Sequence, residues 1–129
     1  MAIKFLNPKT VSFSGKYSLA AEIPAGARLL SVSGQVGTAP DGKLAPNIEA
    51  QCEQVWKNIG EVLKEGGMTY KDIVKMTTFL TDSRFIPASR AARDAVLTEA
   101  PYPSSTLLIV QGLADPAMLV EIEVLAAKA

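Results

Sequence analysis

The stretch NIEAQCEQVWKNIGEVLKEGG, residues 47–67, decides the fold. Asn47 is a residue type that caps helix N-termini, and Gly66-Gly67 is a typical helix stop. Between them, apolar residues recur every three or four positions. They are Ile48, Cys52, Val55, Trp56, Ile59, Val62 and Leu63. This spacing predicts an amphipathic helix with one apolar face, which must pack against another element.

The flanking sequence predicts the sheet that this helix covers. Apolar or alternating runs predict strands at 17–23, 29–33, 72–80, 105–110 and 120–126, with a short extra strand near residue 5. A second helix is expected at about 85–97. The whole chain, residues 1–129, is therefore expected to be a single α+β domain of two layers, a mixed β-sheet with two helices on one face.

The run Leu107-Leu108-Ile109-Val110 is apolar at successive positions, so both faces of this strand are expected to be buried. Helices on one side of a small sheet leave its other face open. We therefore expect an oligomer to bury the open face.

Composition excludes several function classes. The formal net charge is zero, which gives no global field toward nucleic acid or an anionic membrane. There is one cysteine, Cys52, and no histidine, so cysteine-cluster zinc sites and Ser-His-Asp or Cys-His nucleophile systems are excluded. No metal or other cofactor is expected. The N-terminal apolar stretch is too short for a secretory signal, and no run approaches the ~20 residues of a membrane span, so a cytoplasmic protein is expected.

The segment YPSST, residues 102–106, leads into the predicted strand 105–110. A nucleophilic serine would need a base, and no lysine lies between Lys75 and Lys128 in the sequence. Two interpretations remain for Ser104, Ser105 and Thr106: they satisfy backbone groups at a strand start, or they form a ligand-binding edge.

Alternation in VEIEVLA places Val120, Ile122 and Val124 on one face of a strand and Glu121, Glu123 and Leu125 on the other. The two glutamates either are surface carboxylates, or one of them holds or deprotonates a water in a cleft.

Five other positions allow a binding role beside a structural one. Gly34 permits a close approach of backbone or ligand, or marks a strand end or bulge. Tyr17 can stack and donate a hydrogen bond, or pack at a rim. Arg84, Arg90 and Arg93 could bind a carboxylate, although a solvated helix face is the simpler interpretation for Arg90 and Arg93.

Six segments together resemble the RidA-type proteins, also called the YjgF or L-PSP endoribonuclease family. They are GKYSLA, SVSGQVG, QCEQVWKNIGEVLKEGG, DIVKMTTFLTD, YPSSTLLIV and VEIEVLA, within about residues 14–127. The resemblance implies a chorismate-mutase-like fold and a homotrimer with a central β-barrel and clefts between subunits. It also implies an activity, hydrolysis of reactive enamines and imines such as 2-aminoacrylate to 2-keto acids and ammonia.

By position, the resemblance makes Tyr17 and Gly34 cleft residues and Glu121 the residue that positions the attacking water. The chain departs from the family deaminases at three other cleft positions. Ser105 stands where they carry the arginine that pairs with the substrate carboxylate. Leu107 replaces a small or polar residue, and Ser89 replaces a common asparagine. This pattern resembles an arginine-lacking branch of the family.

Three hypotheses follow. The first is a trimer that binds a small metabolite, a carboxylate or an imine, in its clefts without efficient deamination of 2-imino acids. The second is a hydrolase for a different imine or enamine, with Glu121 holding water and Ser105, Thr106 or a mobile Arg90 as anchor. The third is a non-catalytic regulatory protein. RNA cleavage is disfavoured because the chain lacks histidine and a basic, aromatic-bearing stripe, and no nucleic-acid or membrane partner is expected.

Overall fold

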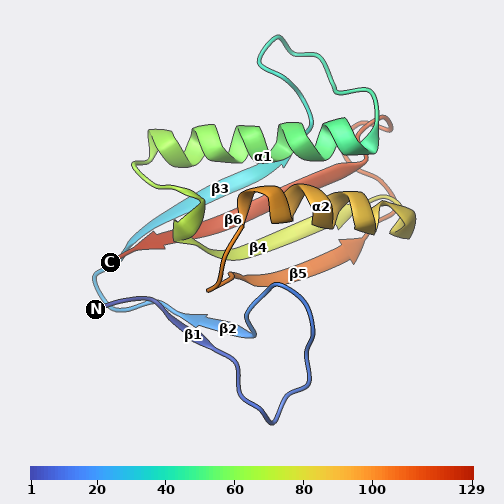
Figure 1. The fold of residues 1–129 in the computed structure, drawn as a ribbon. Helices are drawn as coiled ribbons and strands as arrows, with labels where there is room; N and C mark the ends of the chain where they lie inside the picture. Colours follow the sequence, from blue (N-terminus) through green and yellow to red (C-terminus); the bar gives the residue numbers. More distant parts are fainter.

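A computed structural model describes all residues, 1–129, as a mixed sheet with two helices on one of its faces (Figure 1). The main sheet has four strands in the order β3-β6-β4-β5. Their bounds are β3 Arg28–Val36, β4 Ile73–Leu80, β5 Ser104–Ile109 and β6 Val120–Lys128. Strands β4 and β5 are parallel, whereas β6 is antiparallel to both β3 and β4. The predicted α+β architecture is confirmed.

The N-terminal part of the chain forms a separate two-stranded sheet of β1, Lys4–Leu6, and β2, Ala20–Glu22. The extra strand expected near residue 5 is therefore confirmed. The strand expected at 17–23 is shorter, because Ser18 instead makes an isolated bridge to Ser104 at the beginning of β5. This N-terminal sheet lies along the β5 side of the molecule (Figure 1).

Helix α1, Ile48–Glu65, is the predicted amphipathic helix. The Asn47 side chain accepts a hydrogen bond from the Ala50 backbone N–H at 2.9 Å, which satisfies one of the free donors of the first turn. Gly66 ends the helix, and Gly67 follows with φ +71°, a left-handed conformation that favours glycine. The helix therefore begins and ends where the sequence places its limits.

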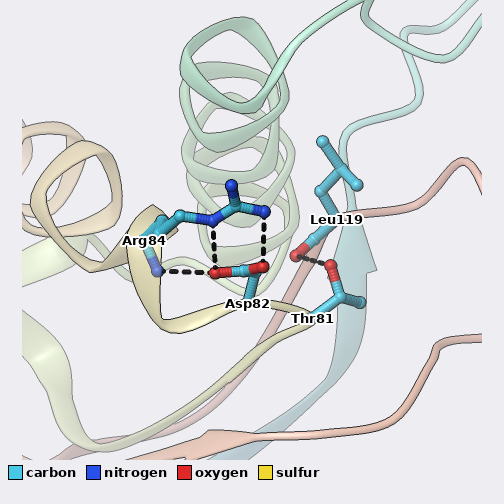
Figure 2. A network of polar contacts seen from close by, with 4 residues as sticks. All are labelled: Thr81, Asp82, Arg84 and Leu119. Atoms are coloured by element: carbon cyan, nitrogen blue, oxygen red, sulfur yellow. Dashed lines mark hydrogen bonds and ion pairs between the residues drawn. The ribbon is translucent and has the colours of Figure 1, made fainter.

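Helix α2, Ile86–Val96, follows the short 3₁₀ helix η2, Ser83–Phe85, after β4. Two sets of contacts stabilise the turn between β4 and η2 (Figure 2). Thr81 contacts the Leu119 carbonyl oxygen through its backbone N–H at 3.1 Å and its hydroxyl at 3.5 Å. Asp82 accepts from the Arg84 backbone N–H at 2.8 Å and from its guanidinium at 3.0 and 2.8 Å. These bonds lower the pKa of Asp82 to about 2.

The core lies between the helices and one face of the sheet. Fully or almost fully buried residues come from α1 and from alternate positions of β4 and β6. They include Cys52, Val55, Trp56, Ile59, Leu63, Met76, Leu80, Val120, Ile122 and Val124. The predicted alternation in β6 is confirmed, because Val120, Ile122 and Val124 are buried while Glu123 is exposed. Burial of this apolar area is the main stabilising term of the fold.

The opposite face of the sheet has no helix over it (Figure 1). The prediction that Leu107, Leu108 and Ile109 are buried on both sides is wrong for the single chain, where they are 37%, 41% and 47% exposed. The physical reason is that β5 is an edge strand, paired with β4 on one side and with only one bridge on the other. No helix of the structure is long and apolar enough to cross a membrane.

Candidate functional site

Gly34 and Glu121 lie in contact on neighbouring strands. Strands β3 and β6 pair with an irregularity between Val32 and Gln35, and Gly34 lies within it. A Cβ added at Gly34 would lie 2.7 Å from Cδ and 2.9 Å from Cγ of Glu121, too close for a real contact. The glutamate side chain therefore occupies the space that the missing glycine side chain leaves free.

Glu121 belongs to the open face of the sheet. It alternates with the buried Val120 and Ile122, and it is paired with Phe79 of β4. Its side chain is partly exposed, and no hydrogen bond or ion pair occupies its carboxylate within the chain. A carboxylate so placed can accept a hydrogen bond from water or from a ligand N–H.

The start of β5 carries the three hydroxyls of YPSST in three different environments. Ser104 Oγ donates to the Val74 carbonyl oxygen at 2.8 Å, which confirms a structural role for this residue. Thr106 Oγ1 accepts from Lys75 Nζ at 2.6 Å. The Ser105 side chain makes no hydrogen bond within the chain. Among Ser104, Ser105 and Thr106, Ser105 is therefore the residue whose hydroxyl has no partner within the chain.

Strand register separates Ser105 and Leu107 from Thr106. Ser105 is paired with Met76 and Leu107 with Thr78. Met76 and Thr78 are buried and face the helices, so the side chains of Ser105 and Leu107 lie on the helix-facing side of β5. Thr106 is paired with Thr77, which is on the open side. Ser105 and Leu107 therefore lie on one face of the sheet and Thr106 on the other.

Tyr17 lies close to the start of β5. The Ser18 backbone N–H donates to the Pro103 carbonyl oxygen at 3.0 Å, which fixes this segment against the edge strand. The Tyr17 ring packs edge-to-face on Phe13, with centroids 5.3 Å apart. Tyr17 also lines a cavity of about 310 Å³ together with residues of α2. The backbone next to Tyr17 therefore lies beside the residues at which β5 begins.

Ser89 lies on α2 and is only 5% exposed. Its side chain lies on the buried side of the helix, so a ligand has no access to it in the single chain. This placement favours a packing role within the chain.

The candidate residues form two groups toward opposite sides of the sheet. Gly34 and Glu121 lie on β3 and β6, whereas Tyr17, Ser105 and Leu107 lie at the β5 edge. Strand β4 separates the two groups within one chain. There is no cluster of three or more histidine, cysteine, aspartate or glutamate side chains that could hold a metal ion.

Lys75 is a site residue that sequence reasoning missed. It lies far from YPSST in the sequence, yet parallel pairing of β4 with β5 brings its ammonium group to Thr106. The signal available in the sequence was the alternation in IVKMTTFL, which places Lys75, Thr77 and Phe79 together on the open face. A cation therefore lies at the start of β5 although position 105 carries none.

Comparison with known proteins assigns the family. The sequence profile described as Endoribonuclease L-PSP matches residues 9–128, almost the whole chain. The chain belongs to this family, the RidA/YjgF family. The crystal structure of YyfB from Yersinia pestis, a protein of unknown function of the conserved Rid family, superposes with a TM-score of 0.89 at 31% identity, covering 99% of this chain and 100% of that one.

Curated Rid-family relatives carry two kinds of name. The RutC family protein YjgH of Escherichia coli is 33% identical over 107 residues, 78% of this chain and 82% of that protein. The 2-iminobutanoate/2-iminopropanoate deaminase of Mus musculus is 39% identical over 70 residues, 53% of this chain and 50% of the deaminase. The chain likewise spans 58% of the length of the Aquifex aeolicus RutC family protein.

Proposed function

We propose that this Rid-family protein binds a small metabolite in clefts between the subunits of a homotrimer and does not efficiently deaminate 2-imino acids. The observation that supports the proposal is Ser105, whose hydroxyl at the start of β5 makes no hydrogen bond within the chain. By the family resemblance, this residue stands where the deaminases carry a carboxylate-binding arginine.

Assembly is supported by what the single chain leaves uncovered. The open sheet face has no helix over it, and Leu107, Leu108 and Ile109 of the edge strand β5 are exposed apolar side chains, which water disfavours. Contact between the β5 edge of one subunit and the Gly34–Glu121 side of the next would unite the two groups of candidate residues. Light scattering tests this assembly: three times 13.7 kDa is expected, and a monodisperse 13.7 kDa species would contradict it.

The effect of an absent arginine on the binding free energy follows from general magnitudes. A charge-assisted guanidinium–carboxylate pair contributes about 1.5–3 kcal/mol. A serine hydroxyl can hydrogen-bond a carboxylate but brings no charge. Its presence is therefore expected to weaken binding of a 2-imino acid by roughly 10- to 100-fold.

The experiment compares the native protein with Ser105→Arg in hydrolysis of 2-aminoacrylate generated in the assay. Thr106→Arg is the matched control, since it adds the same charge one residue away on the other face of β5. The proposal expects little keto-acid release by the native protein, a gain for Ser105→Arg and none for Thr106→Arg. Robust release by the native protein would overturn it.

The Glu121 carboxylate favours a second candidate, a hydrolase for a different imine or enamine. A carboxylate without a partner on the open face is suited to hold an attacking water, and Gly34 leaves room for its side chain. Glu121→Gln should then abolish any hydrolytic activity of the native protein. Glu123→Gln is the control, since Glu123 lies two residues along the same strand face and is exposed. Equal activity of the two variants would exclude this mechanism, whereas absence of any hydrolytic activity in the native protein would favour a non-catalytic regulatory role.

A further inference from the structure

A cationic cavity lies between α2 and the segment that precedes β2. Its volume is about 310 Å³, and its charged and aromatic lining consists of Lys16, Tyr17, Arg90, Arg93 and Asp94. Three of these residues are cations and one is an anion, so the cavity carries a formal charge of +2 (3 − 1) in a chain whose net charge is zero. Such a concentration of one sign requires a physical reason.

The single carboxylate of the cavity is already engaged. Asp94 Oδ1 accepts from Arg93 Nε at 3.0 Å and lies 3.0 Å from its terminal nitrogen. Asp94 Oδ2 lies 3.6 Å from Lys16 Nζ. Asp94 thus joins the loop to the helix and holds two cations in place. The third cation, Arg90, is exposed and has no ion pair or hydrogen bond.

The simplest alternative is that these arginines are an ordinary solvated helix face. Two observations argue against it. The Arg93 side chain is only 15% exposed, so its charge is partly withdrawn from water. Arg90 and Arg93 are also three residues apart on one helix face, where like charges repel. Asp94 offsets this cost for Arg93 but forms no ion pair with Arg90. A bound anion would supply Arg90 with a partner and relieve the remaining repulsion, because a guanidinium presents a planar fork that fits carboxylate and phosphate oxygens.

We propose that this cavity is an anion site for a doubly charged oxyanion, a phosphate group or a dicarboxylate, with Arg90 as its principal contact. Lys16 and Arg93 supply the field, and Tyr17 forms the wall toward β5. The inference rests on the proposed function in one respect: Tyr17 is shared with the proposed metabolite cleft. It adds the class of ligand, a metabolite whose anionic group is bound by α2 instead of by position 105.

The first experiment is a titration of isotope-labelled protein with inorganic phosphate, succinate and acetate at constant ionic strength, followed by amide chemical shifts. We expect phosphate and succinate to cause saturable shifts at Gly15, Lys16 and Tyr17. Acetate, with one charge, is expected to bind about tenfold more weakly. The ratio of phosphate to succinate affinity distinguishes the two ligand classes. Absence of saturable shifts with either dianion would overturn the inference.

Arg90→Ala tests the assignment of the contact, and Arg84→Ala is its matched control. Arg84 is also an exposed arginine of the same region, but it is paired with Asp82 and lies outside the cavity. Arg90→Ala is expected to weaken dianion binding at least tenfold or so, whereas Arg84→Ala changes it less than about twofold. Because Arg90 is exposed and unpaired, its removal should leave the fold intact. Equal affinities of the two variants would refute the site.

The two proposals fail separately. If Ser105→Arg gains no deaminase activity while dianions still bind at Arg90, the proposed cleft function is wrong and the anion site stands. If Ser105→Arg gains activity while Arg90→Ala binds dianions as the native protein does, the cleft function stands and the anion site is wrong.

Discussion

The two faces of the main sheet differ in burial and in residue type, although the same strands supply both. On the helix side, β4 and β6 present Met76, Leu80, Val120, Ile122 and Val124, all at most 4% exposed. On the open side, the alternate positions are Lys75, Thr77, Phe79, Glu121, Glu123 and Leu125, none of which is buried in the single chain. The first face is covered by the chain's own helices, and the second leaves charged, polar and apolar groups uncovered in the single chain.

This difference assigns separate tasks to the two faces. The helix side supplies stability, because its packing is dense and its residues are almost entirely apolar. The open side holds the groups with chemistry, including the Glu121 carboxylate and the Lys75 ammonium. Substitutions on the helix side should therefore change the free energy of unfolding, and those on the open side should mainly change binding or assembly.

The largest effect is expected on the covered face. Ile59→Ala removes a side chain with 0% exposure, and the resulting cavity should lower the free energy of unfolding by about 2–5 kcal/mol. Val62→Ala on the same helix is the control, since Val62 is 38% exposed, and less than about 1 kcal/mol is expected. Urea unfolding at one protein concentration measures both. Similar losses would show that α1 is not packed as described.

A smaller but sharper effect is expected at the one close-packed point of the open face. Gly34→Ala places a methyl group against the Glu121 side chain, which is flexible and must shift, so the cost is expected at the lower end of the about 1–3 kcal/mol typical of overpacking. Gly112→Ala is the control, because nothing lies within 4 Å of its added Cβ.

A double-mutant cycle identifies the cause. If the Glu121 side chain is what a residue at 34 meets, Gly34→Ala should cost little in a Glu121→Ala background, and the two changes should be clearly non-additive. Additive free energies would show that Gly34 and Glu121 do not interact, and that the open face lacks this closely packed contact.

The covered face was largely predictable from sequence and the open face was not. Local signals set α1, since Asn47 caps it and Gly66 ends it, and alternation set β6. Pairing across the sheet carries no local signal. The contact of Lys75 with Thr106 spans 31 residues, and the cavity between Tyr17 and Arg90 spans more. The exposure of β5 also escaped prediction, because an apolar strand has the same sequence whether its own chain or another chain covers it.

Cys52 offers a pH test of the covered face. Desolvation, reinforced by Glu49 and Glu53, raises the pKa of its thiol from 9.0 to about 11. The native state therefore keeps the thiol proton after the unfolded chain loses it. Stability is unaffected below pH 9, falls as the pH rises from about 9 to 11, and should be lower by about 1.4 kcal/mol at about pH 10.

Urea unfolding of the native protein and Cys52→Ala across this pH range isolates the thiol, because alanine cannot ionise. The difference in free energy between the two proteins should be constant up to about pH 9 and should then shrink. A constant difference throughout would mean that water reaches the thiol and that the covered face is less dry than the structure indicates.

The smallest effect is expected where β4 leaves the sheet, in the exposed Asp82–Arg84 pair (Figure 2). The pKa of Asp82 is lowered from 3.8 to about 2, first by the Arg84 side-chain hydrogen bonds and then by its backbone N–H. A lowered pKa stabilises the fold above the unfolded value of 3.8, and this contribution is lost as the pH falls toward about 2. Asp82→Asn keeps a side-chain oxygen for the Arg84 backbone N–H but removes the charge, so its unfolding midpoint in urea should approach that of the native protein between pH 4 and about 2. Because the Arg84 side chain is 83% exposed and that of Asp82 is 32% exposed, water screens the pair, and the gap at neutral pH should be slight. A large difference in midpoint at neutral pH would show that this turn, which leads into α2, contributes to stability as much as residues of the covered face do.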